Sequence, residues 1–143
     1  MAFRGRDEYT LDDRGRVAIP SRYRHKLGET VVLTPGQDGC VEVYSETSFE
    51  AMSDRLESSY PPTTRSGRRR SRLFDSQSQD TDLDRQGRIL LPARFRAMVG
   101  SSGTVVIVGR RVCLEIWDRE KWDQEVQAAL AEAESSSEQG SGG

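Results

Sequence analysis

The sequence has few of the residues on which catalytic and metal sites depend. Among its 143 residues there are one histidine, His25, and two cysteines, Cys40 and Cys113. A metal site with two histidines, or a zinc site with four cysteines, therefore cannot form within one chain. We expect His25, which lies among basic residues, to be an exposed residue of a basic helix. No phosphate-binding loop or dinucleotide fingerprint occurs either, so the sequence predicts no enzyme, cofactor, metal or small-molecule substrate.

Long hydrophobic runs are also missing. Hydrophobic residues make up 34% of the chain and its mean hydropathy is -0.70. No apolar run approaches the ~20 residues that a membrane-spanning helix needs. The N-terminus has no hydrophobic core of the kind that signal peptides carry. We therefore expect a cytoplasmic protein without membrane contact, of a size that suits one domain or two very small ones.

Lysine is nearly absent, and the charges are unevenly distributed. The chain has 19 arginines and 2 lysines, and its net charge is -2. Five of the 23 acidic residues follow Lys121, where no basic residue occurs, so residues 1–122 hold 21 basic and 18 acidic residues, a net charge of +3. Arginine suits paired hydrogen bonds to phosphate and guanine. A nucleic-acid partner would account for this composition, and a codon bias toward arginine would account for it equally well.

The chain repeats itself at an offset of 72 residues. Residues 11–24 align with residues 83–96, and 7 of the 14 positions are identical. The match continues in two further pairs of segments, which are residues 30–33 with 104–107 and residues 40–44 with 113–117. A repeat of this length predicts two copies of one small structural module.

Each copy predicts the same order of elements. We expect a first strand, a turn at Gly15 or Gly87, and a second strand that ends at Pro20 or Pro92. A short helix, two more strands and a final helix follow. The expected first strands are residues 3–11 and 80–83, and the expected second strands are residues 16–19 and 88–91.

One module of about 45 residues would bury too little apolar surface to be stable alone. We therefore expect the two copies to share one core, as an intramolecular pseudo-dimer of the α+β class that is mainly β with short helices. The predicted boundaries are residues 6–48 for the first module, 49–78 for a helical, basic connector, 79–122 for the second module, and 123–143 for the end of the last helix and a disordered acidic Ser/Gly tail.

The final helix of each copy carries its own start signal. Thr47 with Glu50 predicts a capping box for the first, and Asp118 predicts a cap for the second. The second helix, about residues 119–134, has apolar residues four positions apart that we expect to dock on the domain. This stripe consists of Trp122, Val126 and Leu130. From Ser135 onward the Ser/Gly-rich composition predicts disorder.

A basic segment lies between the two copies. After the linker of residues 58–64, residues 65–74 contain five arginines and no acidic residue. We expect a solvated, partly helical connector. The alternatives are a phosphate contact or a charged subunit interface.

Candidate functional residues occur at the two turns, where Asp12-x-x-x-Arg16 and Asp84-x-x-x-Arg88 are equivalent. An aspartate in such a turn can bond to the arginine or to nearby backbone N–H groups, and we expect both aspartates to hold their turns in this way. A β-element that carries arginines can enter a major groove or contact phosphates. The candidates for DNA contact are Arg14, Arg16, Arg22, Arg24, Arg85 and Arg88, with Arg94 and Arg96 beside them, and the candidates for structuring the turns are Asp12, Gly15, Asp84 and Gly87.

These motifs resemble a known family. The two copies of L-D-x-x-G-R-[IV]-x-[IL]-P-x-R-[FY]-R, the segment Leu114–Asp118 and the dipeptide Arg4-Gly5 resemble the MraZ family of bacterial transcriptional regulators, within the SpoVT-AbrB-like swapped-hairpin superfamily. The resemblance covers about residues 1–126. It implies two tandem AbrB-like swapped-hairpin modules that form one pseudo-dimeric barrel, a ring-like homo-oligomer, and DNA contact by the Asp-x-x-x-Arg elements.

The resemblance also implies a function. A member of this family is expected to bind direct repeats in double-stranded promoter DNA and to regulate, usually as a repressor, the division and cell-wall gene cluster that includes its own gene. Such a protein is expected in the nucleoid. The second turn has Gln86 at the position of Arg14, so we expect the N-terminal copy to contribute more to DNA binding.

Two other functions remain as alternatives. An AbrB-type antitoxin would share the DNA-binding element, but it needs a C-terminal segment that wraps a toxin, and this tail is short and poor in apolar residues. An architectural ring-forming protein would need its subunit interfaces and would tolerate the loss of Arg16.

Overall fold

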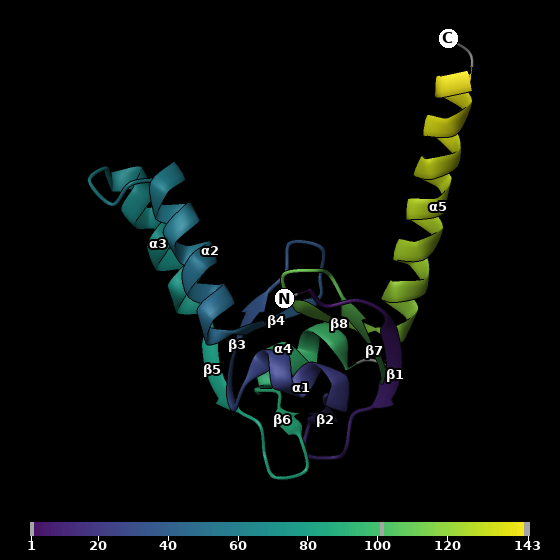
Figure 1. Ribbon diagram of the computed structural model, residues 1–143, viewed down its shortest axis with the longest axis horizontal. Helices are drawn as coiled ribbons and strands as arrows, with labels where there is room; N and C mark the ends of the chain where they lie inside the picture. The colour runs from purple at the N-terminus through teal and green to yellow at the C-terminus, as the bar shows by residue number, and fades with distance from the viewer. Residues whose placement is uncertain (1, 101, 142–143) are drawn as a thin grey trace.

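The structure, a computed structural model, describes residues 2–100 and 102–141, with side chains described up to residue 136. The strands are β1 Arg6–Thr10, β2 Arg16–Ala18, β3 Thr30–Pro35, β4 Val41–Ser45, β5 Gln79–Asp82, β6 Arg88–Leu90, β7 Thr104–Gly109 and β8 Leu114–Asp118. The helices are α1 Ser21–Leu27, α2 Glu46–Ser59, α3 Arg65–Gln77, α4 Ala93–Val99 and α5 Arg119–Ser141 (Figure 1). This composition confirms the predicted α+β class.

The strands form one large sheet and one small ribbon. The sheet has six antiparallel strands in the order β1-β7-β8-β4-β3-β5, and the ribbon consists of β2 and β6. β1 pairs with β7 of the other repeat, with Glu8 opposite Val106, and β5 pairs with β3, with Asp80 opposite Val32. The strand order stays the same when the two repeats are exchanged, so each repeat supplies half of one continuous sheet.

The ribbon joins the two repeats a second time. β2 pairs with β6 in antiparallel register, with Val17 opposite Ile89. Further backbone bonds extend the ladder at both ends, from Ile19 N–H to the Gly87 carbonyl and from Leu91 N–H to the Gly15 carbonyl, each 2.9 Å long. The strand after each glycine turn therefore pairs with its counterpart from the other repeat.

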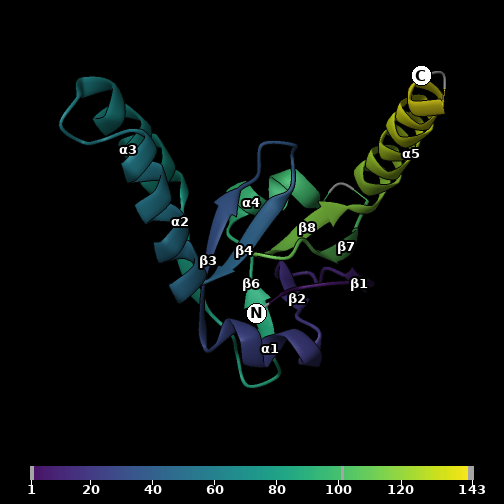
Figure 2. The same ribbon diagram turned by 45° about the horizontal axis from the view of Figure 1, so that its top comes forward.

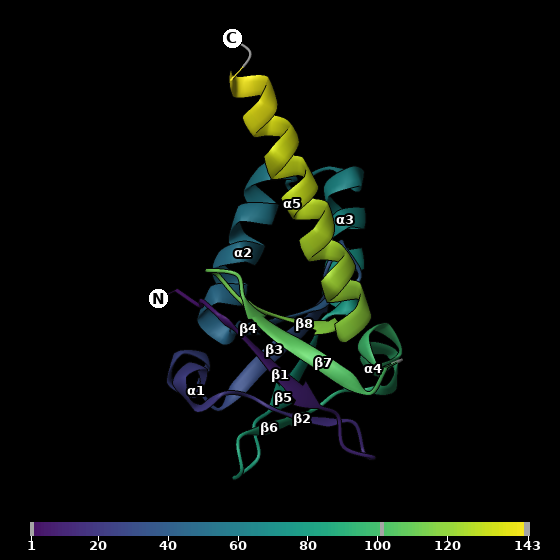
Figure 3. The ribbon, with the colours of Figure 1, turned by 90° about the vertical axis from the view of Figure 1, so that its right-hand side faces the viewer.

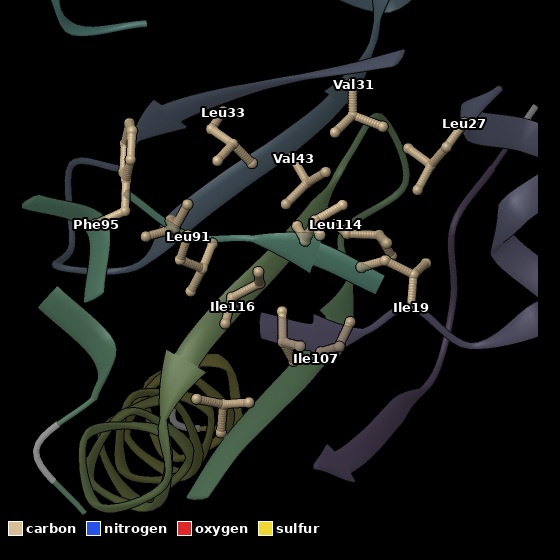
Figure 4. Close-up of a cluster of buried hydrophobic side chains, with 14 of the residues drawn as sticks. Ile19, Leu27, Val31, Leu33, Val43, Leu91, Phe95, Ile107, Leu114 and Ile116 are labelled. Carbon is tan, nitrogen blue, oxygen red and sulfur yellow. The ribbon is translucent and has the colours of Figure 1, made fainter. Parts of the chain in front are cut away.

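One face of the sheet, the ribbon and the helices α1 and α4 enclose the main core (Figure 4). The sheet strands are rich in β-branched residues, which favour extended backbone. Complete burial of each aliphatic or aromatic side chain contributes ~1.5–3 kcal/mol. The fully buried residues with the largest side chains include Tyr23, Phe95, Ile19, Leu33, Ile89, Leu91, Ile107, Leu114 and Ile116.

Helices α1 and α4 are short, and each buries a pair of residues one helical turn apart. Pro20 and Pro92 precede them, as the sequence predicts, and proline suits this place because the first helical N–H groups have no partner within the helix. Tyr23 and Leu27 of α1 are buried, whereas His25 is exposed as expected.

Two helical arms leave the other side of the sheet (Figure 2). One arm is the hairpin of α2 and α3, which is joined to the sheet by a second apolar cluster that contains Val32, Tyr44 and Phe49. Phe49 and Phe74 stack with their ring centroids 5.2 Å apart, which fixes α3 against the base of α2. The expected partly helical connector is thus a complete helix over Arg65–Gln77.

The start of α2 differs from the sequence prediction. Ser45 is its N-cap, and Ser45 Oγ accepts the hydrogen bond from the Ser48 N–H at 3.1 Å. The predicted capping box of Thr47 and Glu50 is therefore wrong. Helical backbone begins as soon as β4 ends, so the first residue that can accept this bond is the last residue of the strand.

The second arm, α5, docks only at its base. Trp122 packs edge-on against Trp117, with 5.7 Å between the ring centroids, and Val126 is half-buried. Leu130 is 60% exposed, so the prediction that the whole stripe docks is wrong at this residue, where the helix has already left the sheet.

Helix α5 also extends further than the sequence predicts, to Ser141, where disorder was expected from Ser135 onward. A helix that is already nucleated adds one hydrogen bond for each further residue, which allows it to continue through modest helix formers. The last two residues of the expected tail, 142–143, lie outside the described residues. No helix within the described ranges is long and apolar enough to cross a membrane.

Candidate nucleic-acid interface

One carboxylate organises the first turn, residues 12–15. Asp12 Oδ1 accepts hydrogen bonds from the backbone N–H groups of Arg14 at 3.0 Å and Arg16 at 2.8 Å. Asp12 Oδ2 accepts a hydrogen bond from Arg16 Nε at 2.7 Å. The N–H of Gly15 donates to the Asp12 carbonyl at 3.0 Å. The aspartate thus satisfies backbone groups that a tight turn leaves without partners.

The second turn repeats this arrangement bond for bond. Asp84 Oδ1 accepts from the N–H groups of Gln86 and Arg88, both at 2.9 Å, and Asp84 Oδ2 accepts from Arg88 Nε at 3.0 Å. Both aspartates therefore act as turn-forming residues, and each holds the first arginine of its following strand.

The hydrogen bonds also determine the charge of the two carboxylates. The backbone N–H of Arg16, followed by its side chain and the N–H of Arg14, lowers the pKa of Asp12 below its usual value. The equivalent groups of Arg88 and Gln86 lower the pKa of Asp84 in the same way. Both carboxylates are therefore ionised at neutral pH.

Each turn needs its glycine for two reasons. Gly15 and Gly87 have φ angles of +82° and +73°, where a Cβ causes strain. A Cβ on Gly15 would also overlap the side chain of Arg96, and a Cβ on Gly87 would overlap the guanidinium of Arg24. Each turn is thus packed against an arginine from the short helix of the other repeat.

The ribbon brings the two turns into one charged surface. Arg16 and Arg88 are 29% and 28% exposed, and Arg88 Nη1 lies 3.9 Å from Asp12 Oδ2, across the boundary between the repeats. Two arginines and two aspartates leave this centre with no net charge. The cationic side chains that stand out from it are the exposed Arg14 and Arg85, at the tips of the turns.

Both turns lie on the side of the molecule that is opposite to the arms (Figures 1 and 3). They follow β1 and β5, which run toward this side at the two edges of the sheet. A long polyanion that passes below the ribbon would therefore meet both turns without contacting α3 or α5.

Some of the predicted residues lie elsewhere. Arg22 forms an ion pair with Asp7 of β1 and donates to the Tyr23 hydroxyl at 2.8 Å. Arg94 donates to Gln79 Oε1 at 3.2 Å. The structure thus places Arg14, Arg16, Arg85 and Arg88 at the turns or the ribbon, and places Arg22 and Arg94 at the flanks.

The roles of Arg24 and Arg96 differ from those that the sequence predicts. Both were predicted as members of the basic clusters, whereas the structure places them under the turns, where Arg24 Nε donates to the Ile19 carbonyl at 2.9 Å. The only signal of a shared role in the sequence is that Arg24 and Arg96 occupy equivalent positions in the two repeats. The contact of each arginine joins one repeat to the other, so the pattern within one repeat does not reveal it.

A shallow groove runs beside the second turn. Its lining includes Arg24, His25, Glu29, Asp82, Asp84 and Arg85. The lining carries charges of both signs, which suits hydrogen-bonding groups better than an apolar ligand. Among the described side chains, no three potential metal ligands are grouped closely enough to hold an ion.

Comparison with known proteins finds matches to one family over nearly the whole chain. Residues 2–70 and 76–141 match the family model of the MraZ protein, described as antitoxin-like. The chain is 40% identical over 122 residues to a protein named transcriptional regulator MraZ from Moorella thermoacetica, covering 85% of each chain. It is 36% identical over 137 residues to the protein of that name from Natranaerobius thermophilus, covering 96% of this chain and 95% of the relative. The same name belongs to a protein of Heliobacterium modesticaldum that is 37% identical over 122 residues, with 85% of each chain covered.

Proposed function

The chain belongs to the MraZ family of transcriptional regulators, and from this membership we propose that it acts by binding double-stranded DNA through its two Asp-Arg turns. The observation that carries the proposal is the pair of turns with the same hydrogen bonds on one side of the molecule. A rigid turn fixes the backbone position of its arginine, so less conformational entropy is lost when that arginine binds a phosphate or a base edge.

The roles of the residues follow from their positions. Arg14 and Arg85 are the primary DNA contacts, because they are exposed at the tips. Arg16 and Arg88 lie on the ribbon between the tips and use Nε to hold their aspartates. Arg24 and Arg96 support the turns from below and are positioning residues. Because the two turns share one geometry, both contact DNA.

The resemblance of the sequence to its family extends the proposal to targets and assembly. The protein binds direct repeats in the promoter of the division and cell-wall gene cluster, including its own gene, as a repressor located at the nucleoid. A ring-like homo-oligomer presents several pairs of turns, so that successive repeats are bound together. Linked contacts of this kind multiply affinity without any new type of contact.

The test is a fluorescence-anisotropy titration over a series of salt concentrations. The labelled duplexes are DNA from upstream of the protein's own gene and a scrambled duplex of the same composition. The proteins are the wild type, the double variant Arg14→Ala/Arg85→Ala, and the control Arg55→Ala on the exposed surface of α2. Each lost phosphate contact makes the dependence of log K on log salt shallower by about 0.9.

We expect the wild type to prefer the upstream DNA and the double variant to bind it about tenfold or more weakly, with a shallower salt dependence. Arg55→Ala should bind like the wild type. Equal binding by the wild type and the double variant would contradict the role of the turns. No preference over the scrambled duplex would favour an architectural role or, with a toxin encoded nearby, an antitoxin role.

A further inference from the structure

The two arms follow equivalent strands of the repeats, and one helix of the first arm, α3, is opposite in charge to α5. The α2–α3 hairpin follows β4, and α5 follows the equivalent strand β8. Helix α3 has five arginines and one aspartate, whereas residues 119–136 of α5 have five acidic residues and two basic ones. Helix α2, the counterpart of α5, is also acidic, so the basic α3 is an addition to the first repeat.

The arginines of α3 fall into two groups. Arg68 donates to the Pro62 carbonyl at 2.9 Å, and Arg70 lies over the ring of Tyr60 at 3.9 Å, so these two stabilise the hairpin itself. The remaining three lie away from α2 and are exposed, and they are Arg65, Arg69 and Arg72. Among the described side chains, no carboxylate lies within ion-pair distance of these three.

An exposed leucine lies within this arginine face. Leu73 is 60% exposed, and it follows Arg69 by one helical turn. The opposite face of α3, with Gly67 and Phe74, packs on α2. Carboxylates of α2, such as Glu50 and Asp54, lie along that helix and do not cover the outer face of α3.

Helix α5 offers the complementary pattern. Its apolar stripe begins half-buried at Trp122 and Val126 and emerges at Leu130, which is 60% exposed. Glu134 follows Leu130 by one helical turn and is exposed, and Asp123 flanks the base of the stripe. An exposed leucine beside an acid on α5 thus matches an exposed leucine beside an arginine on α3.

The two faces cannot meet within one chain. The arms diverge from opposite ends of the sheet, with α3 beyond the edge of β5 and α5 beyond β7 (Figures 1 and 2). Each face can be covered only by another molecule, and a second copy of this chain carries the complement of both.

We infer that the outer face of α3 packs against the exposed face of α5 of a neighbouring copy, with Leu73 against Leu130 and Arg69 facing Glu134. Different surfaces join at this interface, so each copy can bind one neighbour through each arm, and a closed ring forms where the rotation allows it. The inference rests on the proposed ring-like homo-oligomer and names the surfaces through which its copies bind each other. It leaves the DNA-binding turns free on the side opposite to the arms.

The test uses charge reversal in the full-length protein, with mass measured by light scattering after size-exclusion chromatography. Arg69→Glu places Glu against Glu134 at each interface, and Glu134→Arg places Arg against Arg69. We expect each single variant to dissociate at protein concentrations about tenfold or more above those that dissociate the wild type, because like charges in contact oppose association. Arg55→Glu, on α2 of the same arm, is the matched control and should keep the mass of the wild type.

Mixing provides the decisive result. When the Arg69→Glu and Glu134→Arg proteins are combined in equal amounts, every interface between unlike copies again pairs opposite charges, so assemblies larger than a dimer should return. The double variant Arg69→Glu/Glu134→Arg should also assemble. Circular dichroism of each variant verifies the fold.

Three outcomes would overturn the inference. The first is a monomeric wild type. The second is single variants that assemble like the wild type, or whose mixture fails to assemble. The third is an unchanged mass with weakened DNA binding in Arg69→Glu, which would make α3 a nucleic-acid surface. DNA binding through Arg14 and Arg85 is measured separately, so the proposed function can stand where this interface fails, and the reverse.

Discussion

At the scale of single residues, the turns depend on two glycines that serve both conformation and packing. Gly87 has a φ angle of +73° and lies against Arg24, which supports the turn from the other repeat. Gly28 has a φ angle of +84° but no atom within 4 Å of the place of a Cβ. Gly28 and Gly87 thus share a positive φ, but only at Gly87 would a Cβ also have to displace an arginine.

We predict that Gly28→Ala lowers the free energy of unfolding by about 1–3 kcal/mol, from the backbone alone, because its φ of +84° and ψ of −169° are accessible almost only to glycine. Gly87→Ala should lower it by about 2–4 kcal/mol, because Arg24 must also move. Urea unfolding measures both values. Equal losses for the two variants would show that the arginine gives the turn no support.

Three charged residues form a cluster of ion pairs on the outer face of the sheet. Glu42 and Glu115 lie opposite each other on β4 and β8. Arg110 Nη2 lies 3.0 Å from Glu42 Oε2, and Arg110 Nε lies 2.6 Å from Glu115 Oε2. Tyr44 and Trp117 donate to the same two carboxylates, each at 3.1 Å. Burial raises the pKa of Glu42 above its usual value, against the opposing effects of Tyr44 and Arg110.

A buried carboxyl with a raised pKa binds its proton more readily in the folded state, so this group favours folding more as the pH falls from neutral through its folded pKa. Arg110→Met should lower the free energy of unfolding by about 2 kcal/mol at pH 7, a modest value because Arg110 is 47% exposed. Part of this loss should be recovered near pH 5, where Asp12 and Asp84, whose pKa values are lowered, remain ionised.

The control for this prediction is Arg111→Met, in the same loop. Arg111 is exposed, and no carboxylate among the described side chains forms an ion pair with it. It should unfold like the wild type at both pH values. An Arg110→Met protein whose deficit is the same at pH 5 and pH 7 would show that the two glutamates do not limit its stability.

At the scale of elements, the α2–α3 hairpin closes around a glycine. A Cβ on Gly67 would overlap the backbone of Pro61, so only glycine allows α3 to approach this turn. Thr64 caps α3 by accepting the Gly67 N–H at 2.9 Å. The arm thus holds its outer face in place through one close backbone contact at its tip and one aromatic stack at its base.

We predict that Gly67→Ala opens the arm without unfolding the sheet. Hydrogen exchange in residues 61–77 should become about tenfold faster or more, which corresponds to a local loss of about 1.4 kcal/mol or more. Exchange in β3, β4, β7 and β8 should stay unchanged. Ser66→Ala is the control at the adjacent exposed position. Uniform acceleration across the chain would mean instead that the arm and the sheet open as one unit.

The elements also show where sequence reasoning succeeds and where it fails. Glycine turns, helices after proline and β-branched strands follow from local preferences, so the repeat and the periodicity of residues predict them. The N-cap at Ser45 depends on where β4 leaves the sheet, and the exposure of Leu130 depends on where α5 leaves it. These are properties of the packed molecule, which a local pattern does not contain.

The candidate site shows the same division. Asp12 and Asp84 bond to residues two and four positions away, and the motif itself suggests such bonds. Arg22 instead pairs with Asp7, fifteen positions away, and Arg24 packs under a turn of the other repeat. The motif therefore predicts the bonds within each turn, whereas the packing between the repeats decides which arginines lie at the turns.

At the scale of the whole molecule, the repeat gives the chain two distinct sides. The turns and the ribbon lie on one side of the core, and the arms lie on the other (Figure 3). In the proposed assembly, arms join neighbouring copies while pairs of turns face the DNA. Each added copy then adds phosphate contacts, so the salt dependence of binding should steepen with the number of direct repeats in the duplex.

The central claim is that DNA lies across the two turns, and photo-crosslinking tests it most directly. Asp13 and Gln86 are exposed tip residues beside Arg14 and Arg85, so a benzoylphenylalanine at either position leaves the arginines intact. Matched probes at Ser66 on α3 and Arg55 on α2 report on the arm. After irradiation with DNA from upstream of the protein's own gene, we predict covalent adducts from positions 13 and 86 and none from positions 55 and 66. Adducts from the arm, with none from the turns, would contradict the account.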